Sequence, residues 1–460
     1  MLTREVDVVV LGVGSAGSRA ARVAAEAGAR TVAIEAGARL GGLCILRGCM
    51  PTKTLLETAH RLFDIGEAGR FGIRAERPTL DFAAMMERTH QLVARFQRAK
   101  VASIESGPYE LVRGAPRFVS TKAVEVEDTR FVAKAFVIAT GSKPHPLPHE
   151  FDVRVLTSDD VFELEAPPKR VAVIGGGAVG VELATWFARI GTTTSLVNRS
   201  ALLHRSDPEL GRELARALEH EMDLLVPAEI VAARPDGDES IVTFADPQGG
   251  LHERRVDFVL NATGRVPDFD GLDIERLAPD FESDRRPLVD ATFRTALPHV
   301  FLAGDVSGVH GILHEANREG EVAGRNAARV AGRLDGPLES LDERVPKMSV
   351  IFSDPPYATV GLSPSDCDRH GIPYRAADKR FAEQGRGIVH GAQFGAMRLV
   401  VHAEDRRVLG CQILGPRADD LIHVPAAMMS MQGTVDDLYR VPWYHPTLAE
   451  AFVEVCRALR

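Results

Sequence analysis

The sequence predicts an α/β protein made of two similar glycine-turn units, each a parallel sheet flanked by helices, and a C-terminal α+β domain. Two observations predict the paired units: an apolar strand, a Gly-x-Gly-x-x-Gly turn and a helix follow one another at the N-terminus and again near residue 175. Alternating stretches beyond residue 346, such as MRLVVHAEDRRVLGCQILG, indicate antiparallel strands. A chain of 460 residues exceeds one hydrophobic core, so two to four domains are expected.

Composition is that of an ordinary globular protein and disfavours several classes of partner. Of the residues, 45% are apolar and 26% are charged, and the formal net charge of −9 disfavours nucleic acid and anionic membranes. No apolar run approaches the ~20 residues of a membrane span, and an immediate strand pattern leaves no room for a signal peptide. The five cysteines form no secreted disulfide framework, so we expect a cytoplasmic protein.

The first glycine turn ends an apolar strand over residues 6–11. Gly12 makes the tight turn, Gly14 lets the backbone approach a pyrophosphate, and Gly17 lets the helix pack closely on the strand. Glu35 ends the second strand, where it is placed to accept hydrogen bonds from a ribose. This order of strand, turn, helix, strand and acid predicts a dinucleotide site with phosphates at the helix N-terminus.

The second glycine turn repeats the pattern but lacks the terminal acid. Its glycines are Gly175, Gly177 and Gly180. Asn198 and Arg199 stand where the acid is expected, and Arg205 follows. An acid here holds a free ribose 2′-hydroxyl whereas an arginine accommodates a 2′-phosphate, so the sequence favours NADPH over NADH. The alternative is that Arg199 is a solvated surface charge and the site is permissive. Two dinucleotide sites suggest a flavin and a nicotinamide that exchange electrons.

Cys44 and Cys49 lie in GGLCILRGCMPTK, just before an expected helix over residues 52–62. Three interpretations are open for the pair: buried structural thiols, zinc ligands, or a redox disulfide. A helix N-terminus stabilises a thiolate, which reversible disulfide exchange needs near neutral pH. Zinc is disfavoured because no second close cysteine pair exists. No metal site is expected.

In order and over essentially the whole chain, the motifs resemble the pyridine nucleotide–disulfide oxidoreductase family. They are the two glycine turns, GGLCILRGCMPTK at 41–53, ATGSKP at 139–144, NATGRVP at 261–267, VFLAGD at 300–305 and HPTLAE at 445–450. The resemblance implies two Rossmann-like domains, for FAD and NAD(P), and a C-terminal dimerisation domain. The expected bounds are 1–148 and 267–335 for the FAD domain, 149–266 for the NAD(P) domain and 346–460 for the dimerisation domain, with apolar helices near 418–432 and 448–459.

The resemblance also implies roles for single residues. Cys49 would be the sulfur nearer the flavin, able to form a charge-transfer thiolate, and Cys44 the sulfur that exchanges with substrate. Lys53 would lie against the flavin near N5, with Glu182 as its ion-pair partner. Asp305 would hydrogen-bond the ribityl chain of FAD. Further cofactor contacts are implied at Ser15, Ala16, Gly42, Thr140, Gly141, Gly264 and Gly304.

His445 and Glu450 are the expected acid–base pair. Disulfide exchange needs a group that takes a proton from an incoming thiol, and a carboxylate orients a histidine for this work. A cis peptide before Pro446 is plausible in a tight turn. In the family this segment reaches into the partner subunit's active site, which implies a homodimer.

The expected enzyme is an FAD-dependent NAD(P)–disulfide oxidoreductase, most like the dihydrolipoamide dehydrogenase branch, acting on a small or lipoyl-protein disulfide. The alternative is an NADPH-dependent glutathione reductase-like enzyme, favoured by Arg199 and Arg205. A mercuric reductase-like enzyme is disfavoured because the chain lacks a C-terminal cysteine pair. A non-catalytic flavoprotein subunit is disfavoured because every motif residue that catalysis needs is present. Two departures weaken the choice of substrate: Arg47 between the cysteines, which either serves the redox pair or faces solvent, and Trp443-Tyr444 before the histidine.

Overall fold

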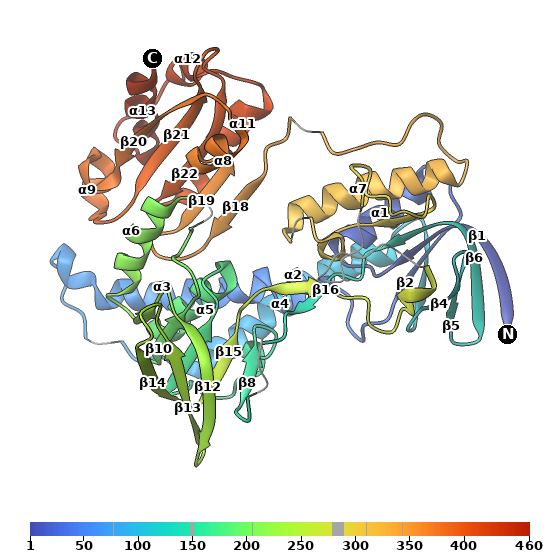
Figure 1. Cartoon of the computed structure of the whole chain (residues 1–460), viewed down its shortest axis with the longest axis horizontal. Coiled ribbons are helices and arrows are strands. Elements are labelled where there is room, and N and C mark those ends of the chain that lie inside the picture. The colour runs from blue at the N-terminus through green and yellow to red at the C-terminus, as the bar shows by residue number, and fades with distance from the viewer. Residues whose placement is uncertain (77, 148–150, 205, 278–288, 310, 343) are drawn as a thin grey trace. The chain divides into compact units, whose positions relative to one another are not determined.

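The computed structural model describes residues 1–76, 78–147, 151–204, 206–277, 289–309, 311–342 and 344–460 (Figure 1). Contacts divide the chain into two compact units, and both are discontinuous in sequence. Unit 1 comprises Met1–Pro51, Glu87–His145 and Arg265–Leu341, and unit 2 comprises Thr52–Met86, Pro146–Gly264 and Asp342–Arg460. No helix within the described ranges is long and apolar enough to cross a membrane.

Unit 1 is built on a mixed sheet in the order β3-β2-β1-β6-β5-β4, with β17 also pairing β6. The strands are β1 Leu2–Leu11, β2 Thr31–Glu35, β3 Glu110–Arg113, β4 Arg117–Ser120, β5 Ala123–Val126, β6 Thr129–Ile138 and β17 Val300–Leu302. Strands β3, β2, β1, β6 and β17 run parallel, and β5 and β4 add antiparallel edge strands. Residues 6–11 of β1 and 135–138 of β6 are buried at every position because both faces of the sheet are covered there. A small ribbon of β7 Ser142–Pro144 and β16 Arg265–Pro267 completes the unit.

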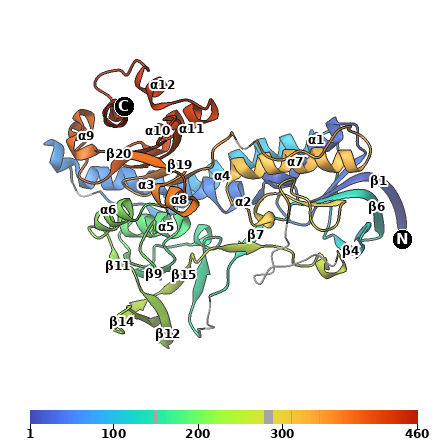
Figure 2. The ribbon, with the colours of Figure 1, turned by 45° about the horizontal axis from the view of Figure 1, so that its top comes forward.

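Helices α1 (Ser15–Glu26) and α7 (Leu313–Val330) lie side by side in unit 1 (Figure 2). Small residues make this close approach possible. A Cβ added to Gly320 would lie 2.2 Å from the backbone oxygen of Ala16, and one added to Gly324 would lie 2.4 Å from that of Ala20. The alanine-rich face of α1 and the glycines of α7 are therefore matched, and a larger residue at either glycine would force the helices apart.

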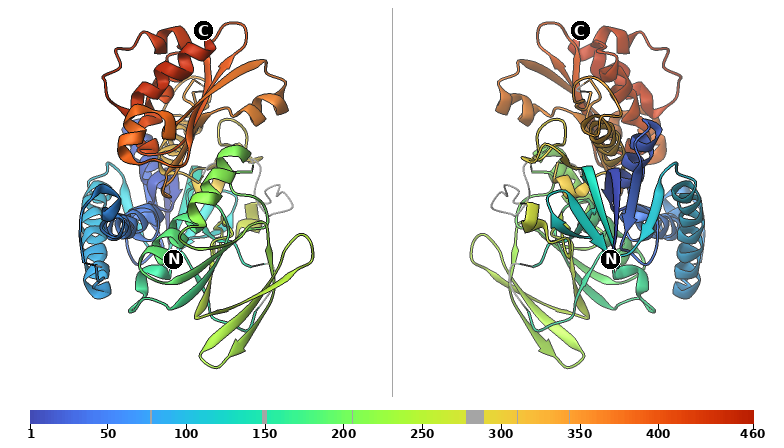
Figure 3. Two further views of the ribbon diagram at one scale, coloured as in Figure 1. Left: turned by 90° about the vertical axis from the view of Figure 1, so that its left-hand side faces the viewer. Right: turned by 90° about the vertical axis from the view of Figure 1, so that its right-hand side faces the viewer.

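The first part of unit 2 is a parallel sheet in the order β11-β10-β9-β15-β8. Its strands are β8 Val155–Thr157, β9 Arg170–Ile174, β10 Thr193–Val197, β11 Asp223–Leu225 and β15 Phe258–Asn261, with helices α5 Ala178–Arg189 and α6 Pro208–Leu218. An antiparallel sheet of β12 Glu229–Asp236, β13 Glu239–Ala245 and β14 Leu251–Val256 projects from it (Figure 3). Trp186 and Phe187 of α5 are fully buried, with ring centroids 4.5 Å apart, and anchor the helix in the core.

The second part of unit 2 is an antiparallel sheet in the order β18-β19-β22-β21-β20, as the alternating pattern predicts. The strands are β18 Met348–Ile351, β19 Tyr357–Gly361, β20 Tyr374–Arg380, β21 Ala396–His402 and β22 Val408–Leu414. The helices are α8 Pro364–His370, α9 Gly385–His390, α10 Ala418–Leu421, α11 His423–Ser430, α12 Val435–Tyr439 and α13 Ala451–Leu459. Cys411 and Cys456 are fully buried in its core.

Three further helices carry or adjoin the cysteine segment: α2 Gly42–Leu46, α3 Cys49–Gly66 and α4 Phe82–Glu105. Helix α3 begins three residues before the expected start at residue 52. Pro51 occupies its third position, where a residue without an N–H leaves no intrahelical bond unmade. Cys49 is therefore the first residue of an 18-residue helix rather than part of the loop before it.

Candidate active site

The first glycine turn has the geometry that its spacing predicts. Gly12 has φ +89°, and a Cβ there would lie 2.5 Å from the backbone oxygen of Ala139. A Cβ on Gly17 would lie 1.9 Å from the oxygen of Gly12, so only glycine fits either position. Helix α1 begins directly afterwards, with Gly14 at its N-cap, and no described side chain caps it. The first-turn N–H groups are thus arranged as in pyrophosphate sites, and the residues fit a dinucleotide.

Glu35 stabilises this turn by hydrogen bonds to its backbone. Its carboxylate accepts hydrogen bonds from the backbone N–H groups of Val13, at 2.9 Å, and Gly37, at 2.8 Å. Asn198 occupies the same place in the second turn, where its amide oxygen accepts from the N–H of Gly176 at 3.0 Å. A residue at the end of the second strand therefore holds the glycine turn by hydrogen bonds in both units, a role that sequence reasoning missed.

The segment with the cysteines packs directly on the first glycine turn. Gly42 has φ +75°, and a Cβ there would lie 2.9 Å from the Cα of Gly14. Gly42 opens α2, which contains the half-buried Cys44, and Cys49 follows as the exposed first residue of α3. The positive end of the α3 dipole lies at Cys49 and favours a thiolate there. Arg47, the C-cap residue of α2, is exposed.

Helix α4 holds the segment that precedes the cysteines. Gln97 donates a hydrogen bond to the backbone oxygen of Leu40 at 2.8 Å. One turn later, Lys100 donates to the hydroxyl of Ser18 at 2.7 Å, and Ser18 donates to the oxygen of Gly14 at 2.6 Å. Burial lowers the pKa of Lys100. Sequence reasoning missed these contacts, although a glutamine and a lysine three residues apart share one helix face.

The ATGSKP and VFLAGD segments meet in unit 1. The hydroxyl of Ser142 donates to Asp305 Oδ2 at 2.7 Å, and Arg265 Nε donates to the same hydroxyl at 2.9 Å. Thr140 donates to the backbone oxygen of Asp268 at 2.6 Å, and Gly141 has φ +81°. Asp305 is therefore oriented before any cofactor binds. Ser142 and Arg265 are additions to the candidate site that sequence reasoning passed over, although both lie within quoted motifs.

The second glycine turn mirrors the first. A Cβ on Gly175 would lie 2.2 Å from the oxygen of Ala262, and one on Gly180 would lie 1.8 Å from the oxygen of Gly175. Gly177 is the N-cap of α5, which no described side chain caps, and Gly264 has φ +119°. These residues fit a second dinucleotide on the same grounds as the first.

Beyond the second strand of this turn, the surface is polar and carries an exposed cation. Asn198 donates to the backbone oxygen of Ser200 at 2.7 Å, and His204 Nδ1 lies 3.1 Å from the Ser200 hydroxyl. Arg199 is exposed. Arg205, the other arginine of the NADPH hypothesis, lies outside the described residues.

Lys53 and Glu182 form a partly buried ion pair in unit 2. Lys53 Nζ lies 2.7 Å from Glu182 Oε2, and the glutamate side chain is only 3% exposed. The other carboxylate oxygen accepts from the backbone N–H of Phe352 at 3.1 Å, and the ammonium lies 4.7 Å from the centroid of the Phe352 ring. The ammonium is thus held in one place by a buried carboxylate and an aromatic face.

His445 and Glu450 form a pair at an exposed turn of unit 2. His445 Nδ1 lies 3.0 Å from Glu450 Oε1, and the peptide between His445 and Pro446 is cis. The backbone N–H of Thr447, followed by His445, lowers the pKa of Glu450. A carboxylate at Nδ1 places the ring proton there and leaves Nε2 as the nitrogen that can accept a proton. The imidazole side chain is 80% exposed, so Nε2 is available to a molecule outside this chain.

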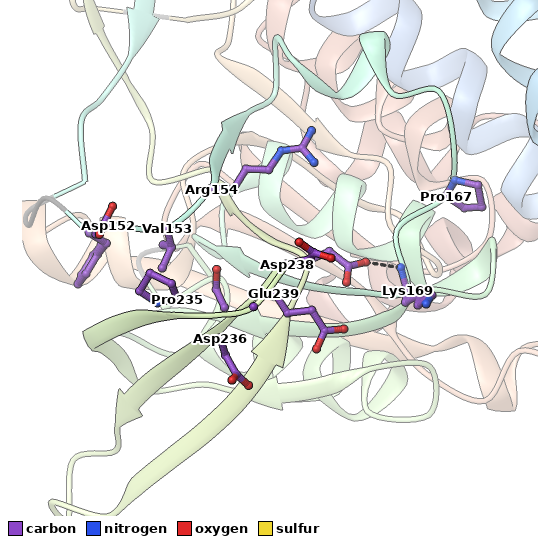
Figure 4. A pocket seen from close by; sticks show the side chains of 13 residues that line it. Asp152, Val153, Arg154, Pro167, Lys169, Pro235, Asp236, Asp238 and Glu239 are labelled. Atoms are coloured by element: carbon purple, nitrogen blue, oxygen red, sulfur yellow. Dashed lines mark hydrogen bonds between the residues drawn. The ribbon is translucent and has the colours of Figure 1, made fainter.

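A cavity of about 840 Å³ lies in unit 2 where the β12–β13 turn approaches the start of β9 (Figure 4). Several of its acids have internal partners: Asp257 accepts from the N–H of Lys169 at 2.5 Å, and Asp236 pairs with Arg255 at 2.6 Å. No predicted site residue lines it. This hollow is therefore separate from the predicted site residues.

Comparison with known proteins gives two family matches that together span most of the chain. Residues 6–320 match the pyridine nucleotide-disulphide oxidoreductase family and residues 348–456 match its dimerisation domain. The chain is 33% identical to a dihydrolipoyl dehydrogenase of Thermus scotoductus, over 98% of this chain and 97% of that one. It is 29% identical to a soluble pyridine nucleotide transhydrogenase of Mycobacterium bovis, over 98% and 96% of the two chains.

Among solved structures, the HOCl-induced flavoprotein disulfide reductase RclA from Escherichia coli has the same fold. The TM-score is 0.84 at 22% identity, over 99% of this chain and 100% of that one. The sequence prediction of an α/β flavoprotein fold with a dimerisation domain is therefore confirmed. The chain belongs to the pyridine nucleotide-disulphide oxidoreductase family, whose members are flavin-dependent oxidoreductases that bind FAD and a pyridine nucleotide.

Proposed function

We propose that this protein is a homodimeric, FAD-dependent NAD(P)–disulfide oxidoreductase of the dihydrolipoyl dehydrogenase type, with Cys44 and Cys49 as its redox pair. The observation that carries the proposal is the packing of Gly42 on Gly14, which places the cysteine segment against a dinucleotide turn. Relatives named dihydrolipoyl dehydrogenase, 31–33% identical over nearly the whole chain, support the substrate class.

The exchange step follows from the chemistry of the pair. A thiolate of the substrate dithiol attacks the Cys44 sulfur of the Cys44–Cys49 disulfide and releases the Cys49 thiolate at the start of α3. The second substrate thiolate attacks the resulting mixed disulfide, which closes the substrate disulfide and releases Cys44 as a thiolate. The flavin, when bound, supplies the two-electron chemistry between this dithiol and the nicotinamide.

His445 manages the protons of this exchange. Its Nε2 takes the proton of the incoming substrate thiol and, in the reverse direction, returns a proton to the departing substrate thiolate, while Glu450 at Nδ1 stabilises the charged ring. The ring is exposed and belongs to the part that matches the family's dimerisation domain. We therefore assign it to the cysteines of the partner subunit in a homodimer.

Lys53 and Glu182 are proposed to position charge beside the flavin. The Glu182 carboxylate restricts the Lys53 ammonium to one position. Because Glu182 is buried, removing either residue would leave an unpaired charge and destabilise the protein. The proposed cofactor domains are residues 1–148 with 267–335 for FAD and 149–266 for nicotinamide, and residues 346–460 form the subunit interface.

NADPH is the proposed nicotinamide cofactor. Asn198 has no carboxylate to accept a hydrogen bond from a ribose 2′-hydroxyl, and its amide already binds the N–H of Gly176 and the backbone oxygen of Ser200. Arg199 is exposed beside it. This leaning also supports the second candidate, an NADPH-dependent glutathione reductase-like enzyme. The cytoplasm is the proposed location, because the few, scattered cysteines suit a reducing compartment.

The test is turnover of dihydrolipoamide and of glutathione disulfide, each with both nicotinamides, by the wild-type enzyme and Cys44→Ser. We expect Cys44→Ser to lower dihydrolipoamide turnover by at least about a thousandfold while flavin absorbance is retained, because the exchanging sulfur is lost. Cys367→Ala, at a buried thiol of α8, is the matched control and should keep activity.

Three other outcomes change the proposal. Turnover of glutathione disulfide alone moves the enzyme to the second candidate. Full activity of Cys44→Ser removes the cysteine pair from the mechanism. Hydride exchange between NADPH and NAD⁺ that persists in Cys44→Ser, with no disulfide turned over, makes the protein a transhydrogenase.

A further inference from the structure

A carboxyl group is buried beneath the turn that carries Asp305. Glu319, in the second turn of α7, has 0% exposure. Its Oε2 accepts a hydrogen bond from the backbone N–H of Gly304 at 2.8 Å and from the hydroxyl of Ser307 at 3.1 Å. These two donors flank Asp305 on either side in the chain. Glu319 therefore grips the turn at both ends.

The turn needs these hydrogen bonds because its backbone adopts a left-handed conformation at Gly304. Gly304 has φ +79°, and a Cβ there would lie 2.9 Å from the Cβ of Ala16 on α1. The turn is therefore pressed against the helix whose N-terminus is proposed to hold the pyrophosphate. A short 3₁₀ turn then runs over Asp305–Ser307, so the direction of the Asp305 side chain depends on the preceding glycine.

Glu319 is itself held rigidly. Its neighbour Gly320 packs on the backbone of Ala16, so α7 cannot slide along α1 without a clash. The surroundings do not favour a charge: burial raises the pKa of Glu319 to about 7, and the carboxylates of Glu315 and Asp305 add to the effect. Retaining an acid at a site so unfavourable to it suggests that its acceptor oxygen serves the turn.

We propose that Glu319 is a positioning residue for FAD: it fixes the Gly304–Asp305 turn so that the Asp305 carboxylate meets the cofactor in one orientation. Asp305 is steadied from the other side by Ser142, which donates to it at 2.7 Å. The Asp305 carboxylate is therefore oriented before the cofactor binds, so the free energy of binding does not include the entropic cost of ordering it. This inference rests on the proposed placement of FAD at Asp305.

The experiment compares FAD binding by three variants in the full-length protein. Apoprotein is titrated with FAD, and quenching of flavin fluorescence gives the dissociation constant. Glu319→Leu removes the acceptor and leaves two buried donors without it. Glu319→Gln keeps an acceptor oxygen of the same reach. Glu321→Gln is the matched control, since Glu321 lies on the same helix and pairs with Arg19 of α1 at 2.7 Å, away from the turn.

We expect Glu319→Leu to raise the dissociation constant for FAD at least about tenfold, because loss of a buried acceptor leaves its donors without a partner. Glu319→Gln should restore affinity and the flavin absorbance envelope, and Glu321→Gln should leave both unchanged. Wild-type affinity in Glu319→Leu overturns the proposal, and so does equal weakening in all three variants. If Glu319→Leu does not fold, a Glu319→Gln protein with tenfold weaker binding and an altered spectrum also overturns it, because rescue has failed.

Failure of the proposed function would look different. A wild-type protein that binds FAD tightly but turns over no disulfide removes the enzyme assignment and leaves the role of Glu319 intact. A wild-type protein that does not take up FAD removes both.

Discussion

At the scale of single residues, carboxylates do different work according to what surrounds them. Glu450 lies at an exposed turn, where an N–H and an imidazole lower its pKa, so it stays ionised and orients His445. Glu319 lies under the Asp305 turn, where burial raises its pKa to about 7. The same side chain is thus an electrostatic partner in one place and a buried hydrogen-bond acceptor in the other.

The raised pKa of Glu319 makes stability depend on pH with a definite sign. The folded protein holds the proton more tightly than the unfolded chain, so Glu319 favours folding most at pH values below the unfolded pKa of about 4.5. This advantage is lost as pH rises through about 7, and the loss amounts to at most about 3 kcal/mol.

Thermal unfolding of the FAD-saturated protein at pH 5.5 and pH 8 measures this loss. We expect Glu319→Gln, which has no proton to lose, to gain Tm relative to wild type as pH rises. Glu321→Gln corrects for changes shared by any charge removal on α7. A constant wild-type-to-Gln difference across the two pH values contradicts the prediction.

Some residue roles could not be read from the sequence. The contact of Ser142 with Arg265 joins residues far apart in the chain, and nothing local marks either side chain as a partner. Glu319 leaves a weak signal, because it falls on the apolar face of an amphipathic helix, where a charged residue calls for a reason. Sequence spacing correctly predicts the glycine turns because their requirement is steric and local, as the clashes at Gly17 and Gly180 show.

At the scale of helices and strands, the predicted order is observed while the ends of elements shift. The apolar stretch expected as one helix near 418–432 is two helices, α10 and α11, with Pro425 in the first turn of the second. The helix expected over 448–459 begins at Ala451, after a 3₁₀ turn in which Glu450 caps Thr447. Caps and prolines decide these boundaries, and apolar periodicity does not report them.

The close contact between α1 and α7 in unit 1 can be tested by a single substitution. We expect Gly320→Ala to lower the free energy of unfolding by about 1–3 kcal/mol, because its Cβ would meet the backbone of Ala16 at 2.2 Å and the helices must separate. FAD content on purification should fall with it. Chemical denaturation monitored by circular dichroism measures the change.

Gly66→Ala is the matched control for that substitution. It also replaces a helical glycine, in α3, but a Cβ there has no atom within 4 Å. We expect it to be neutral or stabilising by up to about 1 kcal/mol, since alanine favours the helix. Equal losses in the two variants would show that helix propensity, rather than packing, governs the effect.

At the scale of the whole molecule, the proposed enzyme is complete only as a pair of chains. The dimerisation domain covers residues 348–456, and the exposed His445 lies within it. In a twofold dimer each site would take cysteines from one subunit and the histidine from the other.

Mixed dimers test this arrangement. Coexpressed Cys44→Ser and His445→Gln subunits carrying different tags yield a purified heterodimer with one defect in each chain. We expect about half of wild-type activity, because twofold symmetry places both defects in one site and leaves the other whole. Each homodimeric variant is the control and should be nearly inactive. An inactive heterodimer would mean that each chain serves its own cysteines.

The exposed turn that ends in Glu450 has a consequence for inheritance. A missense allele that replaces only His445 would leave both glycine turns, the cysteines and the buried α13 unchanged while removing the proposed proton carrier. Coexpressed with an intact gene, such an allele would leave one working site in every mixed dimer. In the proposed dimer its chains would supply working cysteines to sites completed by the histidine of an intact chain, so the number of active sites would follow the number of intact chains whatever the proportion of defective ones.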